Sequence, residues 1–290
     1  MRFRGARRVL AFFLAAAALA QDVTFKTSVK LVEVYATVFD NSGRAIDGLT
    51  KDQFQLLDNG KSQPIRVFEQ TTEAISCALL LDTTGSMQTA LPEVLNAARN
   101  FIRELRPGDL ASIYAFNEQL TQIQDMTADK TALNRALIRL QARGRTALFD
   151  SVSQLALQLE KHPGKKAIVL LTDGGDNASV LNRESAARRA RKAGVPVFAV
   201  AEGDALKEAG TAHLLHELAE ATGGHMYKAK ASKDLRHIFE EISQDLQNGY
   251  LLAFAPQEES GDQSWHDLQI LVKDVAKPVR VRARTGYSVD

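Results

Sequence analysis

The stretch "AISCALLLDTTGSMQ", residues 74–88, decides the fold of this chain. Residues 74–81 form an apolar run that is typical of a buried β-strand. The run stops at Asp82, which is followed by two threonines, a glycine and a serine. A strand that ends in this way can lead into a tight turn, a phosphate-binding loop, a nucleophile site or a metal site. The other strand ends of the chain distinguish among these four possibilities.

The N-terminus has the pattern of a secretory signal peptide. A basic segment precedes an apolar run over residues 9–20, and Ala18-Leu19-Ala20 is a small-x-small cleavage pattern. The run is too short to cross the hydrocarbon core of a membrane. We therefore expect signal peptide 1–20 to direct export to the periplasm, the cell surface or the medium. An uncleaved N-terminal anchor is the alternative.

Charge and cysteine content exclude some functional classes. The net charge of +1 over 290 residues creates no general field that would attract nucleic acid or anionic lipid. Cys77 is the only cysteine, so an internal disulfide is excluded and the fold depends on its hydrophobic core. We expect Cys77 to be a small core residue.

Two β-rich segments flank a middle region. Residues 21–73 include the alternating stretch "VKLVEVYATVFD" and the hairpin "FQLLDNGKSQPIRVFEQ", which turns at Asp58-Asn59-Gly60. Residues 249–290 contain "YLLAFAP", "WHDLQILVKD" and "VRVRARTGYSV". Neither flank is long enough to enclose a core alone, but their roughly seven strands suffice for one sandwich.

The middle region, residues 74–248, alternates strands and helices. Apolar spacings of three and four predict helices over about 91–105, 129–140, 147–161, 183–193, 207–224 and 234–247. The connection at 118–120 is too short for a crossover helix, so the strand after it must be antiparallel. The predicted fold is α/β: a doubly wound, mostly parallel six-stranded sheet inserted in a β-sandwich formed by both flanks.

Two strands of the middle region end in acidic loops. The first ends at Asp82, and "KAIVLLTDGGDN" ends at Asp173. Ligands of doubly wound sheets bind beyond the carboxyl ends of strands, where the strand order reverses, so neighbouring strands would bring both carboxylates to one crevice. The every-other-residue spacing of Asp82, Thr84 and Ser86 can turn their side chains to one side. Thr146, in "RGRTALFD", offers a further hydroxyl from a separate loop.

This donor set predicts a site for a hard cation. Carboxylates and hydroxyls without clustered histidine or cysteine suit Mg²⁺, or Mn²⁺, in octahedral coordination. Asp176, three residues after Asp173, is expected either to support the site through a second layer of contacts or to serve as a turn residue.

The pattern resembles the von Willebrand factor type A domain and its metal-ion-dependent adhesion site. The signature is Asp-x-Ser-x-Ser after the first strand, then a distant threonine and a distant aspartate, and here it is Asp82-Thr83-Thr84-Gly85-Ser86, Thr146 and Asp173. Thr84 replaces the first serine and keeps its hydroxyl. The resemblance covers about residues 74–247. The stretches "DNSGRAIDGLTKDQFQLLDNGK" and "VRVRARTGY" resemble a bacterial exported subgroup with β-rich flanks.

The resemblance implies a function as well as a fold. It implies a metal held directly by Thr84, Ser86 and Thr146, with Asp82 and Asp173 acting partly through water. It also implies a protein-binding module that captures an exposed aspartate or glutamate of a partner protein, without catalytic residues. We therefore expect an exported, metal-dependent adhesion or recognition protein, not an enzyme.

Several alternatives remain beside this interpretation. Asp82, Thr84 and Ser86 could merely cap the next helix in an A domain whose metal site is degenerate. Asp82 could be a phosphotransfer nucleophile of a haloacid-dehalogenase-like phosphohydrolase, although such enzymes need a second aspartate where Thr84 stands. "DTTGSMQ" lacks the lysine of a P-loop.

Other candidate residues fit surface roles better. His213 and His216 with Glu217 lack the spacing of a zinc helix, so a solvated helix face is favoured. The basic run within residues 188–192 is also expected on a solvated face. Trp265 is expected in the core or at the edge of the sandwich.

Overall fold

The computed structural model describes most of the chain after the expected signal peptide. The described residues are 31–71, 73–162, 164–207, 209–256 and 265–288. The predicted signal peptide and its cleavage pattern lie outside these residues. None of the helices in the described ranges is both long and apolar enough to cross a membrane.

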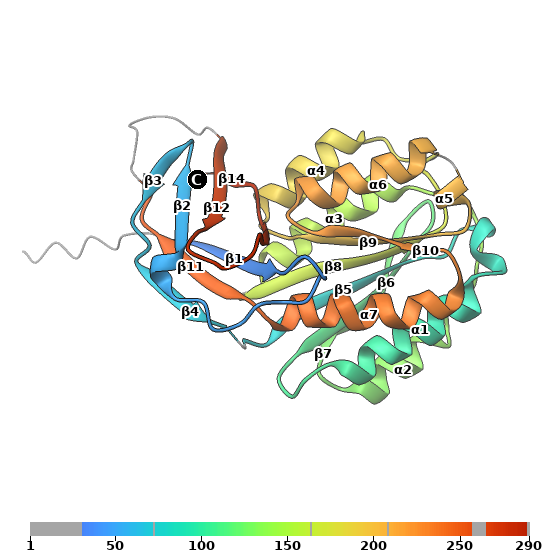
Figure 1. Ribbon diagram of the computed structural model, residues 1–290. Helices are drawn as coiled ribbons and strands as arrows, with labels where there is room; N and C mark the ends of the chain where they lie inside the picture. The colour runs from blue at the N-terminus through green and yellow to red at the C-terminus, as the bar shows by residue number, and fades with distance from the viewer. Residues whose placement is uncertain (1–30, 72, 163, 208, 257–264, 289–290) are drawn as a thin grey trace, which may run out of the picture. The chain divides into compact units, whose positions relative to one another are not determined.

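A six-stranded sheet forms the centre of the middle region, in the order β10-β9-β8-β5-β6-β7 (Figure 1). Neighbouring strands run parallel except β7, which is antiparallel to β6 as the short connection predicted. Every residue of β5 is buried, because β8 and β6 pair with its two sides and helices cover both faces. The strands are β5 (Ile75–Asp82), β6 (Leu110–Phe116), β7 (Leu120–Thr127), β8 (Lys165–Thr172), β9 (Val197–Glu202) and β10 (His225–Ala229).

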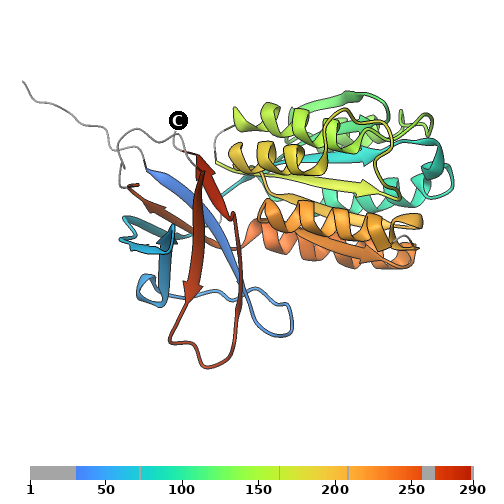
Figure 2. The ribbon, with the colours of Figure 1, turned by 90° about the horizontal axis from the view of Figure 1, so that it is seen from above.

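Helices lie on both faces of this sheet (Figure 2). Because side chains alternate along a strand, Cys77, Leu79 and Leu81 pack beneath α1, α2 and α7, whereas Ala78 and Leu80 pack beneath α3, α4 and α6. The predicted doubly wound α/β architecture is therefore confirmed. The helices are α1 (Leu91–Glu104), α2 (Lys130–Leu137), α3 (Leu148–Glu160), α4 (Arg183–Lys192), α5 (Asp204–Lys207), α6 (Ala209–Ala221) and α7 (Ser232–Gln247), with 3₁₀ turns η1 (Lys51–Gln53) and η2 (Gly85–Gln88).

Three helices differ in extent from the sequence prediction, and one of them is α6, which ends at Ala221 instead of about residue 224. The helix expected over about 129–140 ends at Leu137, because the Ile138 N–H closes a tighter turn onto the carbonyls of Arg135 and Ala136. The last helix begins at Ser232, two residues before the predicted start. There the Asp234 carboxylate accepts the backbone N–H of Ala231 at 3.0 Å, which satisfies a donor that the first helical turn leaves unpaired.

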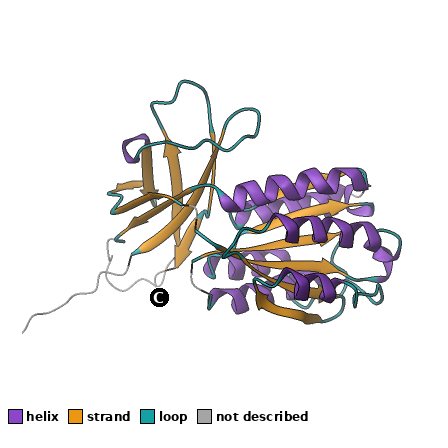
Figure 3. Ribbon diagram, turned by 90° about the horizontal axis from the view of Figure 1, so that it is seen from below, coloured by secondary structure: helices purple, strands orange, loops and turns teal. Residues whose placement is uncertain are grey.

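Both flanks together form the β-sandwich, as predicted (Figure 3). One four-stranded sheet has the order β13-β1-β11-β4 and the other β14-β12-β2-β3, so each sheet mixes strands from before and after the middle region. The described residues hold eight flanking strands rather than about seven. They are β1 (Val32–Phe39), β2 (Phe54–Asp58), β3 (Lys61–Gln63), β4 (Val67–Gln70), β11 (Tyr250–Phe254), β12 (Trp265–Val272), β13 (Arg280–Ala283) and β14 (Gly286–Ser288).

The sandwich combines an apolar core with one buried polar cluster. The hairpin between β2 and β3 turns at Asn59 and Gly60, whose φ values of 48° and 76° give the positive-φ turn that the sequence predicts. Asp58, which is 5% exposed, accepts a hydrogen bond from the Tyr287 hydroxyl at 2.8 Å and lies 2.9 Å from His266 Nδ1. This cluster ties β2, β12 and β14 together.

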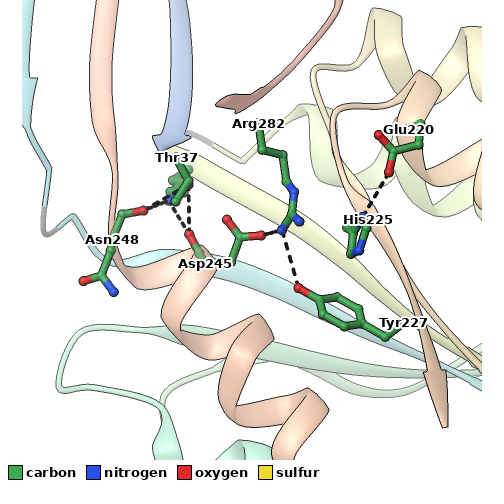
Figure 4. A network of polar contacts seen from close by, with 8 residues as sticks. Thr37, Glu220, His225, Tyr227, Asp245, Asn248 and Arg282 are labelled. Atoms are coloured by element: carbon green, nitrogen blue, oxygen red, sulfur yellow. Dashed lines mark hydrogen bonds and ion pairs between the residues drawn. The ribbon is translucent and has the colours of Figure 1, made fainter. Parts of the chain in front are cut away.

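A buried ion pair joins the sandwich to the last helix of the α/β region (Figure 4). Arg282 of β13 pairs with Asp245 of α7 and also lies 3.4 Å from the Tyr227 hydroxyl. The Thr37 hydroxyl of β1 lies 3.3 Å from the backbone carbonyls of Asp245 and Asn248. The end of α7 is therefore held by two strands of the sandwich, β1 and β13.

A second contact crosses the same junction and corrects one expectation. Arg191 of α4, in the basic run expected to face solvent, lies over the Trp265 ring with its guanidinium carbon 4.2 Å from the ring centroid. Arg189 donates to the Ser153 hydroxyl at 3.0 Å. Part of this basic run therefore packs against the rest of the protein instead of facing solvent. The apolar stem and the delocalised charge of an arginine can both pack on an aromatic face.

Replacing Arg282 by alanine should destabilise the fold strongly. Asp245 is 3% exposed, so the substitution leaves a buried carboxylate without its guanidinium, at a cost of about 3–5 kcal/mol in free energy of unfolding. Urea unfolding followed by circular dichroism measures the loss. Arg280→Ala, on the same strand but exposed, is the matched control and should cost about 0.5 kcal/mol or less. Equal losses in the two variants would contradict this assignment.

Candidate metal centre

The candidate site is built at the carboxyl ends of β5 and β8. These strands are neighbours and run parallel with Leu81 opposite Leu171, so Asp82 and the residues after β8 emerge at one edge. Asp82 is fully buried, and one of its carboxylate oxygens accepts the Thr84 backbone N–H at 2.9 Å. The other oxygen lies 2.5 Å from the hydroxyl of Thr172.

Two hydroxyls connect the loop after β5 to the carboxylate of Asp173, which follows β8. The Oγ atoms of Thr84 and Ser86 lie 3.1 Å apart, and Ser86 Oγ donates to Asp173 Oδ1 at 2.8 Å. Thr84 is 1% exposed and Asp173 6% exposed, so their donors are sheltered from bulk water. Asp82, Thr84, Ser86 and Asp173 are therefore joined across the two strand ends by a series of hydrogen bonds that begins at the Thr84 N–H.

Thr146 lies on a third loop that backbone hydrogen bonds hold against the other two. Its carbonyl accepts the N–H groups of Asn177 and Ala178, both at 3.0 Å, while Gly85 donates to the Gly144 carbonyl at 3.1 Å. Gly144 has φ +85°, a conformation that glycine adopts without strain, and its α-carbon faces the Glu118 carboxylate. Backbone contacts thus hold the Thr146 loop against the loops of Asp82 and Asp173, but among the described residues the Thr146 hydroxyl has no hydrogen bond to the other candidate ligands.

Two further aspartates hold these loops together. Asp176 accepts the Phe149 N–H at 3.0 Å and the Ser179 N–H at 3.0 Å, so it acts as a turn residue that also caps the start of α3. Asp150 accepts the N–H groups of Val180 and Leu181, both at 2.9 Å. Sequence reasoning left the role of Asp176 open.

Sequence reasoning missed three polar residues of this edge. Asp150 binds the loop after β8, Thr172 contacts the Asp82 carboxylate, and the side chain of Asn177 accepts the Thr146 N–H at 3.0 Å. A usable signal existed for Thr172 alone, because it directly precedes Asp173 at the strand end. The partners of Asp150 and Asn177 are distant in sequence.

The helix-capping alternative finds no support in this geometry. α1 begins at Leu91, and its N-cap residue is Ala90, four residues after Ser86. Thr84 stands at the N-cap of the short turn η2, where its side chain makes no capping hydrogen bond. The hydroxyls of Thr84 and Ser86 are instead directed at one another and at Asp173.

Electrostatics at this edge favour a bound cation. Burial raises the pKa of the Asp82 carboxyl, and the charge of Asp173 adds to the rise, whereas hydrogen bonds from Thr172 and Thr84 oppose it. No basic side chain of the described ranges forms an ion pair with Asp82. A buried carboxylate without a counter-charge is costly, and a cation offsets that cost. The surrounding oxygen donors are those of Mg²⁺ or Mn²⁺ sites.

The zinc alternative is not supported in the residues that the structure describes. No group of three or more histidine, cysteine, aspartate or glutamate side chains forms a metal-binding cluster there. His213 and His216 each pair with a glutamate four residues later on the exposed surface of α6. The candidate centre depends mainly on hydroxyls, with only two carboxylates, so it is not such a cluster.

Comparison with known proteins shows the family. The profile of the von Willebrand factor type A domain matches residues 77–241, more than half of the chain. This chain belongs to the von Willebrand factor type A domain family. A UPF0353 protein of Mycobacterium avium is 24% identical to it over 203 residues, which cover 58% of this chain and 59% of that relative. The chain therefore spans about three-fifths of the curated relative that it matches.

Solved A-domain structures share the fold at low sequence identity. A von Willebrand factor type A protein from Catenulispora acidiphila has a TM-score of 0.53 at 15% identity and covers 92% of this chain and 76% of its own. The corresponding domain of the type V pili tip protein Mfa5 from Porphyromonas gingivalis has a TM-score of 0.52 at 12% identity. The match covers 60% of this chain and 95% of that domain. BatB from Bacteroides thetaiotaomicron has a TM-score of 0.51 at 17% identity, and the match covers 59% of this chain and 98% of BatB.

A half-buried glutamate beside the centre should make stability depend on pH. Burial, with repulsion from Glu93 and Asp173, raises the pKa of Glu202 from 4.5 to about 7. The folded state therefore holds this proton more tightly than the unfolded chain, so stability falls as pH rises between about 4.5 and 7. Glu202→Gln removes the titration. With chelator present, its melting temperature should match wild type at pH 4 and exceed it at pH 8.

Thermal unfolding at several pH values tests this expectation. Glu69→Gln, an exposed glutamate on β4 of the sandwich, is the control and should leave the pH dependence unchanged. A constant difference between Glu202→Gln and wild type over the whole range would show that Glu202 titrates normally.

Proposed function

We propose that this protein is an exported, non-enzymatic binding module that uses a divalent cation to capture an acidic group of a partner protein. The observation that carries the proposal is the series of hydrogen bonds that joins Asp82, Thr84, Ser86 and Asp173 at one edge of the sheet. Asp82, Thr84 and Asp173 are buried, whereas Ser86 is exposed, and Asp82 has no basic partner among the described residues.

The proposed division of roles is the one that the resemblance to the metal-ion-dependent adhesion site implies. Thr84, Ser86 and Thr146 would bind Mg²⁺ or Mn²⁺ directly through neutral hydroxyls, whereas Asp82 and Asp173 would act partly through water. A cation whose direct protein ligands are neutral keeps most of its positive charge. An aspartate or glutamate of another protein is then the natural ligand for a remaining coordination position, which makes the metal part of the recognition surface.

Two structural relatives support a role in protein recognition outside the cytoplasm. Mfa5 is a pili tip protein, and the D319A mutant of PilB, a minor pilin from Streptococcus sanguinis, matches with a TM-score of 0.50 at 14% identity. The proposed export is consistent with the signal-peptide pattern at residues 1–20.

The phosphohydrolase alternative is disfavoured by the surroundings of Asp82. A nucleophilic carboxylate must reach its substrate, but Asp82 is fully buried and both of its oxygens have partners. The position two residues later, where such enzymes carry a second aspartate, is Thr84, whose hydroxyl lies next to that of Ser86. The acid that such enzymes carry at this position for proton transfer is therefore replaced by a hydroxyl.

Asp82→Ala should abolish metal binding while the fold survives. The substitution removes the buried charge that attracts the cation, so Mg²⁺ affinity should fall at least tenfold, about 1.4 kcal/mol. Calorimetric titrations with Mg²⁺, Mn²⁺ and Ca²⁺ measure the affinity, and circular dichroism monitors the fold. Asp125→Ala, an exposed aspartate on β7, is the control. Wild-type Mg²⁺ affinity in Asp82→Ala would refute the site, and absence of binding in wild type would indicate a degenerate one.

An acidic peptide should bind only in the presence of the metal. A short peptide with one aspartate is expected to bind the Mg²⁺-loaded protein in the millimolar range or better, roughly 4 kcal/mol or more. Excess EDTA should remove the binding, and the matching asparagine peptide should not bind. Nuclear magnetic resonance titration detects affinities of this order. Unchanged binding in EDTA would contradict metal-dependent capture.

A further inference from the structure

A polar cleft adjoins the candidate metal centre along the β6–β7 hairpin. Its lining includes Thr83, Asn117, Gln119, Thr121, Arg139 and Arg143. Its volume of about 160 Å³ is equivalent to about five water molecules at their share of liquid volume. The cleft thus has room for a carboxylate side chain, and its polar lining offers amides, a hydroxyl and two guanidinium groups.

Hydrogen bonds connect this cleft directly to the metal loop. Thr83 stands between Asp82 and Thr84, and its N–H and hydroxyl both contact the Phe116 carbonyl, at 2.9 and 3.0 Å. The Thr83 carbonyl accepts the Arg143 backbone N–H at 2.7 Å. Thr83, a residue of the cleft lining, therefore lies in the chain directly between two residues of the candidate metal centre, Asp82 and Thr84.

The charge of the cleft is positive and not neutralised within the described residues. Arg139 and Arg143 are exposed, and neither guanidinium has an ion pair or hydrogen bond to any described residue. The lining contains no carboxylate. Glu118 is the nearby acidic side chain, and it accepts the Arg145 backbone N–H at 2.8 Å. Arg145 itself bonds the Asn177 carbonyl, so its guanidinium is not available to the cleft.

We propose that Arg139 and Arg143 form a second subsite, which binds a second carboxylate of the same acidic peptide segment whose first carboxylate binds the metal. This inference rests on the proposed function of the centre. An exposed arginine–carboxylate pair is worth little alone, but a peptide already anchored at the metal presents its second carboxylate at high effective concentration. Guanidinium groups bind carboxylates in a bidentate geometry, which adds selectivity for aspartate or glutamate over a neutral side chain.

The subsite predicts a preference for partners with two spaced acidic residues. Each extended residue advances a peptide by roughly 3.4 Å, so a series with the two aspartates separated by one to five residues samples the reach from centre to cleft. At least one spacing should bind the Mg²⁺-loaded protein about five- to tenfold more tightly than the peptide with a single aspartate. This advantage should shrink as NaCl rises, because the contact is exposed and screened.

The decisive experiment measures binding of both peptides to charge-neutralised variants in Mg²⁺. The Arg139→Gln/Arg143→Gln double variant should lose the advantage of the second aspartate and keep wild-type affinity for the single-aspartate peptide and for Mg²⁺. Arg135→Gln, which removes an exposed arginine on α2 outside the cleft lining, should keep the full advantage. Melting temperatures check that all variants fold.

The outcomes separate this inference from the function on which it rests. An advantage that survives in the double variant, or is lost equally in Arg135→Gln, would overturn the subsite. The subsite would also be overturned if none of the spacings bound more tightly than the single-aspartate peptide. If the di-aspartate peptide binds equally in EDTA but still depends on Arg139 and Arg143, the cleft is supported as a carboxylate subsite and metal-dependent capture is refuted.

Discussion

The parallel pairing of β5 with β8 is the constraint on which the rest of this structure depends. Both strands are buried by helices on two faces, and a shift of one residue would move every side chain to the opposite face. The observed register places Leu81 opposite Leu171. That register, in turn, sets the Thr172 hydroxyl against the Asp82 carboxylate and brings Asp173 within reach of Ser86.

Side-chain hydrogen bonds to the backbone hold the loops above this edge together. Asp176 and Asp150 together accept four backbone N–H groups that join the start of α3 to the segment after β8. Each aspartate satisfies donors that would otherwise be left unpaired near a helix start. An oxygen-lined site on such loops is preorganised, so a ligand does not have to order them on binding.

The sandwich and the sheet are linked through the ends of helices rather than through a long connection. α7 ends at Gln247 and β11 begins at Tyr250, so the chain passes between the two parts within three residues. Arg282 contacts Asp245 from the sandwich side, while Lys165, whose pKa burial lowers to about 8, donates to the Asp245 and Asn248 carbonyls from the sheet side. The position of α7 is consequently defined by both parts.

The sequence by itself determined the architecture and the identity of the candidate ligands. Apolar periodicity separated strands from helices, the three-residue connection after β6 required an antiparallel β7, and the acidic strand ends indicated Asp82 and Asp173. Only the tertiary structure decided which side chains support that edge. Asp150, Asn177 and the Arg191–Trp265 contact each join residues about thirty or more positions apart, and local patterns carry no information about such pairs. Tertiary contacts also decided where the helices end, because capping hydrogen bonds and side-chain packing both act on the last turn of a helix.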